Sequence, residues 1–284
     1  MQYMNTFSFT QSELTRVELL HFIQNSTAAA LWDSNSAAVN ALKHSTASHI
    51  LFKHPILDKL NQCQLSLEQL KFIHINYFTA IVKNFTDALS MAIYQACSLE
   101  NCHNIDPEKR IASKIYSRYL LSLNLIDELG FNTRQLDQSS PSKSHLVYFL
   151  KLMQQLELNA ADGQAAADEA VALAQFIQQH LHSYADLLLI LACTELQVIK
   201  FSEALRCNIS IYGQIYTQGY YACHGIAEAD GSDTLANDDN HEDDIWALLT
   251  QCYVSENALH FQQLQTDYLA LWDNFWSKMN QQLA

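Results

Sequence analysis

Apolar side chains recur along most of this chain at intervals of three and four residues, the spacing of one buried face of an α-helix. The clearest run extends from residue 66 to about residue 97. Ser66 and Gln69 have the spacing of a capping box at its start. The pattern predicts one long helix with a broad buried stripe, formed by Leu67, Leu70, Ile73, Tyr77, Ile81, Phe85 and Leu89.

The same spacing predicts helices over the rest of the chain, and alternation typical of strands does not extend far anywhere. A first helix follows a capping box of Thr10 and Glu13 and turns Leu14, Val17, Leu20 and Ile23 toward a core. The segment at 184–216 is apolar over most of its surface, which predicts a central helix. The other predicted helices lie at residues 36–43, 106–129, 141–157, 165–180, 220–228 and 243–281.

Composition agrees with an all-α protein, because the chain of 284 residues holds only 6 Gly and 3 Pro. No linker divides two cores, so a single domain is expected. The 7 cysteines are odd in number and form no CxxC pair, which predicts free thiols in a reducing compartment. The first residues do not form a basic stretch followed by an apolar one, so a secretory signal is not expected. The most apolar run, 187–192, is too short to span a membrane. A soluble cytoplasmic protein is expected.

Charge limits the partners further. The chain carries 16 basic and 30 acidic residues, a net charge of −14. Such a surface repels phosphate backbones, so nucleic acid is not expected as a partner. Residues 228–244 hold many of the acids and no base. This segment is predicted to be a solvated, mobile insertion.

The first candidate site lies at the junction between two predicted helices. Gly130 has the position of a left-handed helix terminator, which places Glu128 in the last turn before it. An acid there faces the negative end of the helix dipole unless something positive offsets it. Ser140 and Pro141 read as the cap and first position of the next helix, so His145 falls in its opening turns. Glu128 and His145 are expected to meet, either as an ordinary hydrogen bond or as metal ligands.

Further candidate ligands follow along the chain. Glu195 lies among apolar helical neighbours, which predicts a buried carboxylate that is neutralised, paired or bound to a cation. His224 and Glu228 share a face if their segment is helical. His241 lies among acids, where a solvated side chain is the simpler interpretation. Carboxylate and imidazole ligands on several helices suit iron or manganese inside a helical bundle.

The segments HPILDKL, LSLEQLKFIHINYF, NLIDELG and LACTELQVI, in this order, resemble the heme-oxygenase-like superfamily. Its members include the TenA-type thiaminases, PqqC, CADD and the heme-oxygenase-like diiron oxidases. The resemblance covers residues 53–253 and implies a heme-oxygenase-like helical bundle at 51–284, preceded by a helical extension at 1–50.

The diiron branch of that superfamily has the ligand order Glu, His, Glu and then His-x3-Asp-x2-His. The resemblance assigns these roles to Glu128, His145, Glu195 and the His224 and Glu228 pair. The chain departs from the pattern at Gly231, which stands where the last His is expected, and His241 could replace that ligand.

The resemblance implies an iron-dependent oxidase or oxygenase, with one or two Fe, that acts with dioxygen on a small organic substrate. The substrate would bind in a cavity lined by Tyr77, Phe78, Tyr220 and Tyr221. A homodimer is expected.

Two alternatives remain open from the residues. One is a metal-free TenA-like hydrolase or small-molecule-binding relative, with Cys193 as the nucleophile. The other is a protein-interaction module whose acidic 228–244 segment binds a basic partner.

Overall fold

The computed structural model describes residues 12–132, 135–223 and 237–281. Within these ranges the chain forms α-helices joined by short 3-10 and π segments, and no strand occurs. The predicted all-α class is therefore confirmed. The helices are α1 (Ser12–Asn25), α2 (Ala29–Ser48), α3 (Pro55–Asn61), α4 (Leu67–Tyr77), α5 (Lys83–Gln95), α6 (Arg110–Glu128), α7 (His145–Gln155), α8 (Asp168–Gln179), α9 (Tyr184–Ser210), α10 (Tyr220–Cys223), α11 (Asn237–Cys252) and α12 (Ala258–Gln281).

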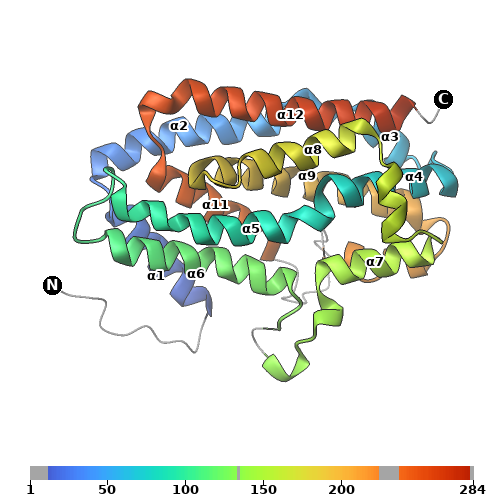
Figure 1. The fold of residues 1–284 in the computed structure, drawn as a ribbon, viewed down its shortest axis with the longest axis horizontal. Helices are drawn as coiled ribbons and strands as arrows, with labels where there is room; N and C mark the ends of the chain where they lie inside the picture. The colour runs from blue at the N-terminus through green and yellow to red at the C-terminus, as the bar shows by residue number, and fades with distance from the viewer. Residues whose placement is uncertain (1–11, 133–134, 224–236, 282–284) are drawn as a thin grey trace.

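Helix α9 lies inside the bundle, as its apolar surface predicts. Its neighbours include α3, α5, α11 and α12. Figure 1 shows α2 and α12 along one side of the bundle, α1 and α6 along the opposite side, and α7 at one end. Every residue at 187–195 of α9 is buried. A helix that is apolar all round is stable in water only when neighbours cover it on all sides.

The first two helices belong to the same hydrophobic core as the rest of the chain. Leu19 and Ile23 of α1 and Val39 and Leu42 of α2 are buried in it. The prediction that Val17 faces the core is wrong, because its side chain is 60% exposed. Helix α2 is also much longer than the predicted segment at 36–43.

The long helix predicted from residue 66 is interrupted in the middle. The capping box of Ser66 and Gln69 is present, but a π-helical segment, η2 (Phe78–Val82), separates α4 from α5. A π turn loosens the α-helical hydrogen-bond pattern and often occurs at functional sites. The Asn84 side-chain amide donates to the carbonyl oxygen of Thr79 at 3.0 Å. This bond helps to satisfy the backbone where the pattern changes.

The single final helix predicted at 243–281 is wrong, because the chain breaks between α11 and α12. Side-chain amides bind carbonyl oxygens at the end of α11 and directly after it. Asn35 donates to the carbonyl oxygens of Thr250 and Tyr253 at 3.1 and 3.0 Å, and Asn104 donates to that of Tyr253 at 2.6 Å. These donors satisfy orphan carbonyls at the helix end. They lie far away in sequence, so local spacing does not indicate the break.

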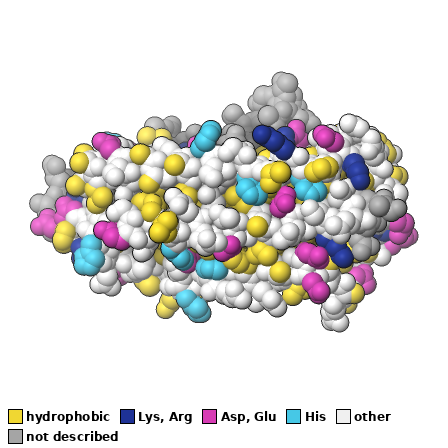
Figure 2. Space-filling view, turned by 90° about the horizontal axis from the view of Figure 1, so that it is seen from above, with side chains coloured by type: hydrophobic (Ala, Val, Ile, Leu, Met, Phe, Trp, Pro, Cys, Tyr) yellow, Lys and Arg dark blue, Asp and Glu magenta, His cyan; other side chains and the backbone are white. Residues whose placement is uncertain are grey.

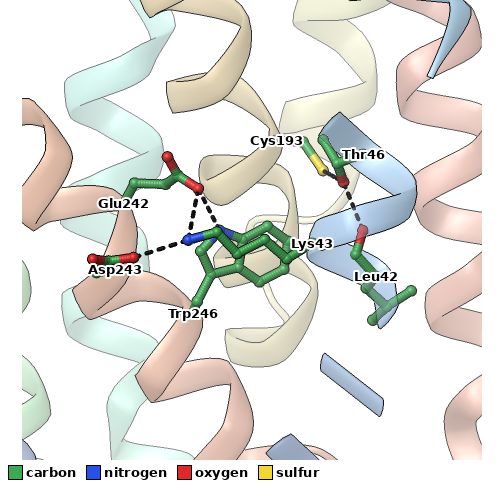
Figure 3. Close-up of polar contacts among 7 residues, drawn as sticks. All are labelled: Leu42, Lys43, Thr46, Cys193, Glu242, Asp243 and Trp246. Atoms are coloured by element: carbon green, nitrogen blue, oxygen red, sulfur yellow. Dashed lines mark hydrogen bonds and ion pairs between the residues drawn. The ribbon is translucent and has the colours of Figure 1, made fainter. Parts of the chain in front are cut away.

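Part of the acidic segment is packed rather than solvated, which corrects the prediction for residues 228–244. Residues 228–236 lie outside the described residues, whereas α11 begins at Asn237. Glu242 accepts hydrogen bonds from Lys43 and from Trp246, at 3.3 and 2.8 Å (Figure 3). Asp244 is buried and forms an ion pair with Arg16 of α1, with an N–O distance of 2.8 Å. The acids at 242–244 thus join α11 to α1 and α2.

The surface carries many separate charges. On the face drawn in Figure 2, acidic and histidine side chains are scattered among apolar ones, and the Lys and Arg side chains of the described residues are few. In the described part of the chain, no helix combines the length and the apolar character that crossing a membrane requires.

Gly130 ends α6 in the left-handed conformation that the sequence predicts, with φ of +83°. A Cβ atom at this position would lie 2.5 Å from the carbonyl oxygen of Ser140 and 2.6 Å from the backbone nitrogen of Ser144. The close approach places the end of α6 against the segment that leads into α7. Gly130 therefore brings the two helix ends together for both a conformational and a steric reason.

Replacing Gly130 with Ala should lower the free energy of unfolding by about 2–5 kcal/mol, because left-handed strain is added to a backbone clash. Urea unfolding measures the loss. Gly213→Ala is the matched control, since φ there is +147° and the nearest atom to a Cβ is a Tyr216 side-chain carbon at 3.6 Å. Its loss should be about 1–3 kcal/mol. Equal losses would show that the contact at Gly130 has no steric importance.

Candidate functional site

The Glu128 and His145 side chains meet, as the sequence predicts. The carboxylate oxygen Oε1 of Glu128 lies 2.9 Å from Nδ1 of His145. Both side chains are buried. Helix α6 ends at Glu128 and α7 begins at His145, so the contact joins the last residue of one helix to the first residue of the next. The Ser140 cap with Pro141 starts only a 3-10 turn, and Ser144 caps α7 itself.

This contact explains how an acid is tolerated at the end of α6. No basic residue lies in the last turn of α6, where an acid faces the negative end of the helix dipole. The partner of Glu128 is the first residue of α7, at the positive end of another dipole. Burial disfavours the charged imidazole, but the nearby Glu128 carboxylate and a hydrogen bond with Cys223 outweigh it and raise the pKa of His145 well above its usual range.

Glu195 is buried, as its apolar neighbours predict. Its Oε1 accepts a hydrogen bond from the Asn124 amide at 3.1 Å. Asn124 lies one turn before Glu128 on α6, and both residues are buried. The same face of α6 therefore presents Asn124 to Glu195 on α9 and Glu128 to His145 on α7.

One cavity connects the three predicted ligands. Glu128, His145 and Glu195 all line a cavity of about 30 Å³. A cavity of this size has room for a water molecule or an ion. The rest of its wall is mostly apolar, and it comes from η2, α5, α7, α9 and α10: Ile81, Val82, Phe85, Thr86, Leu146, Val198 and Tyr220.

The chemistry of the wall is suited to a cation more than to an anion. Of the residues that the structure describes, two carboxylates and one imidazole are the only ionisable groups that line the cavity, apart from the Tyr220 phenol. The apolar side chains opposite them lower the local dielectric constant and so strengthen electrostatic interactions inside. Among the described residues, however, no three His, Cys, Asp or Glu side chains are grouped closely enough to hold a metal ion. Glu128 and His145 bind each other directly, so an ion would have to replace their hydrogen bond.

The substrate cavity predicted beside Tyr77, Phe78, Tyr220 and Tyr221 is filled by packed side chains. Only Tyr220 lines the cavity described above. Tyr77 is fully buried and its ring packs near those of Phe149, Trp272, Phe275 and Trp276. Its hydroxyl donates to Gln197 at 3.3 Å, and burial raises its pKa further above the usual range. The Tyr221 hydroxyl lies 2.7 Å from Nε2 of His74, whose pKa burial lowers to about 4.

Cys193 also lies away from this cavity. It is fully buried, and its sulfur lies 3.6 Å from the Thr46 hydroxyl, which donates to the backbone of α2 (Figure 3). Burial raises the pKa of the Cys193 thiol to about 12. A nucleophilic cysteine is active as its thiolate, which this environment disfavours. The geometry gives the nucleophile hypothesis for Cys193 no support.

The remaining predicted ligands are not brought to the cavity by the described part of the structure. His224 and Glu228 lie outside the described residues, and so does Gly231. His241 is half-buried on α11 and is not among the residues that line the cavity. The predicted set therefore divides into three side chains that share a cavity, one that lies elsewhere and two that are not described.

Sequence reasoning missed Cys223, the last residue of α10. Its thiol lies near the His145 imidazole and helps to raise the pKa of that group, and the same imidazole contacts Glu128. Cys223 is half-buried and is not part of a disulfide. Cys223 directly precedes the predicted ligand His224, and this adjacency could have indicated it, but only imidazoles and carboxylates were predicted as ligands. The contact adds a thiol to the edge of the site.

No protein-family model matches the sequence, and a search of the curated proteins finds no match either. The arrangement of these side chains is therefore the basis for a functional proposal.

In metal-free protein, the His145 titration should make stability fall as pH rises. The pKa of the imidazole is higher in the folded protein than its unfolded value of about 6.5. Its contribution to the free energy of unfolding is therefore complete below pH 6.5 and is lost as the pH rises through the pKa of the folded state. Glu128→Gln removes the nearby negative charge, lowers the folded pKa and flattens this dependence. NMR titration of His145 and urea unfolding from pH 6 to 9 test both effects. Glu157→Gln, at an exposed acid, is the control; equal titration midpoints in both variants would contradict the assignment.

Proposed function

We propose that this protein is an iron-dependent oxidase or oxygenase that acts with dioxygen on a small organic substrate. The observation that carries the proposal is that Glu128, His145 and Glu195, from three different helices, line one cavity. Carboxylate and imidazole ligands suit non-heme iron, and ligand sites between the helices of a bundle are built in this way. The order of the three residues along the chain agrees with the resemblance to the heme-oxygenase-like diiron oxidases.

The side chains have distinct roles in this proposal. Glu128 and Glu195 supply carboxylate oxygens, and His145 supplies an imidazole nitrogen once it has exchanged Glu128 for the ion. The Asn124 amide holds Glu195 in orientation through its hydrogen bond, as partners of metal ligands commonly do. Iron, when bound, supplies the activation of dioxygen.

The apolar wall has a separate role. Pockets for small organic molecules are typically about 300–1,000 Å³, far larger than the 30 Å³ of this cavity. A substrate must therefore displace side chains before it can approach the carboxylates. Ile81 and Val82 belong to the π segment η2, where the backbone departs from regular α-helix. We assign the movement to this wall, since the opposite wall is fixed by buried hydrogen bonds.

Iron binding tests the proposal directly. Protein reconstituted with ferrous iron under anaerobic conditions and then desalted should retain one or two iron atoms per chain, as measured by elemental analysis. Glu195→Gln should lower the retained iron at least about tenfold, because loss of a ligand charge weakens binding while the amide oxygen can still accept from Asn124.

Glu242→Gln is the matched control for this experiment, because Glu242 is also a buried carboxylate but lies on α11 outside the cavity. Its iron content should equal that of the wild type. Two results would overturn the proposal: wild-type protein without stoichiometric iron, or Glu195→Gln protein with wild-type iron content.

A second candidate function is supported by the contacts of His145. A thiol, an imidazole and a carboxylate in series, Cys223, His145 and Glu128, form the arrangement of nucleophile, base and orienting group used in covalent catalysis. In this alternative the protein is a metal-free hydrolase, and Cys223 replaces Cys193 as the nucleophile. The protonated imidazole of His145 would stabilise the Cys223 thiolate, and Glu128 would hold the imidazole in position.

Alkylation rates separate the two candidates. If His145 activates Cys223, His145→Gln should slow the reaction of iodoacetamide with Cys223 at least about tenfold at pH 7, followed by peptide mass spectrometry. The exposed Cys97 provides an internal control within the same chain. An unchanged rate at Cys223 would exclude the thiol mechanism. Glu195→Gln should leave this rate unchanged even if it abolishes iron binding.

A further inference from the structure

Two cysteines far apart in sequence lie together at the surface of the bundle. The sulfur atoms of Cys63 and Cys207 are 3.8 Å apart, although 144 positions separate the residues. Cys63 follows α3 and is half-buried, and Cys207 lies near the end of α9 and is exposed. Both are outside the candidate site described above.

The backbone around the pair is held firmly in place. The Asn208 side chain accepts from the backbone nitrogen of Leu65 at 3.0 Å and donates to its carbonyl oxygen at 3.1 Å. The Tyr212 hydroxyl donates to the same carbonyl oxygen at 2.7 Å. Three hydrogen bonds therefore fix Leu65, two residues after Cys63, against the end of α9 and the residues that follow it.

The two thiols also bind the backbone across the junction. The Cys63 thiol lies 3.4 Å from the carbonyl oxygen of Cys207, and the Cys207 thiol lies 3.5 Å from that of Asn61. A disulfide needs an S–S distance of about 2.05 Å. Since the backbones are already adjacent, the sulfur atoms need to approach by roughly 1.8 Å, the difference between the observed and the bonded distance.

We propose that Cys63 and Cys207 form a reversible disulfide that links the segment after α3 to α9, with a small-molecule disulfide such as oxidised glutathione as the oxidant. Cys207, the more exposed thiol, loses its proton and attacks one sulfur of the oxidant. One glutathione thiolate leaves and takes up a proton. Cys63 then loses its proton and attacks the Cys207 sulfur of the mixed disulfide, and the second glutathione leaves as a thiol. Two protein thiols are oxidised and one glutathione disulfide is reduced.

The environment sets the rate of this reaction. Burial, with the adjacent Cys63 thiol, raises the pKa of Cys207. The thiolate, not the thiol, attacks a disulfide, so oxidation should be slow at pH 7 and faster at pH 8.5. A thiol with a raised pKa reacts with small disulfides more slowly than a catalytic cysteine, whose pKa is lowered.

The test treats the folded, full-length protein with oxidised glutathione, blocks the free thiols and maps the cysteine peptides by mass spectrometry. Wild-type protein should yield a linked peptide pair containing Cys63 and Cys207. In Cys63→Ser the reaction should stop at the mixed disulfide, with one glutathione on Cys207. In Cys207→Ser the linked pair should be absent, and Cys97→Ser, at another exposed cysteine, should behave as the wild type.

Two further readouts establish that the link belongs to the folded protein. The melting temperature of the oxidised protein should exceed that of the reduced protein by about 5–10 °C, because the bond closes a long loop. Reduced glutathione should reverse both the link and the shift. Mixed disulfide on wild-type Cys207 without the linked pair, or a link between other cysteines, would overturn the proposal. Circular dichroism of each serine variant distinguishes these results from misfolding.

Discussion

The burial of α9 is the constraint on which the rest of the structure depends. Residues 187–195 of α9 are all buried, so a polar side chain in this stretch needs a partner, since an unsatisfied buried polar group costs about 1–3 kcal/mol. The partners come from different helices. Thr194 lies 2.6 Å from the Tyr268 hydroxyl of α12, and Glu195 accepts from Asn124 of α6. The polar positions of α9 thereby determine which faces of its neighbours turn inward.

The candidate site is a local consequence of this arrangement. Helix α6 satisfies Glu195 with Asn124 and, one turn later, ends at Glu128. Gly130 then turns the chain back so that α7 starts at His145, beside that carboxylate. Three ionisable side chains gather at one cavity because two helix ends and one central helix meet there. The negative charge of Glu128 is unfavourable at the end of α6, and the turn at Gly130 places His145 beside it to balance that charge.

The sequence predicts local features of this protein well, and distant ones less well. The capping box at Ser66, the left-handed Gly130 and the buried Glu195 each depend on a few neighbouring residues, and each is confirmed. The break between α11 and α12 depends on amides of Asn35 and Asn104, which are remote in sequence. The family resemblance also implied a cavity beside Tyr77, where large rings fill the space.

The site shows the same division between local and distant information. Spacing around Gly130 was enough to predict that Glu128 and His145 meet, because the two residues flank one turn. The Cys223 thiol reaches His145 from α10, a short helix whose position no local pattern specifies. The ligands predicted from the sequence were carboxylates and imidazoles, so the Cys223 thiol was not among them. Contacts between side chains are therefore predicted best where the two helices that carry them follow each other in the sequence.

The π segment η2 has a consequence for how this protein can vary. A π turn accommodates one residue more than an α turn, and each residue of an α-helix turns the chain by roughly 100°. Removal of one residue from Phe78–Val82 would restore a regular helix and rotate α5 relative to α4 by about that angle. The aromatic contacts of Tyr77 and the cavity wall at Phe85 could not then both be kept. The extra residue thus lets α4 and α5 face different surroundings: α4 packs in the core, and α5 lines the cavity.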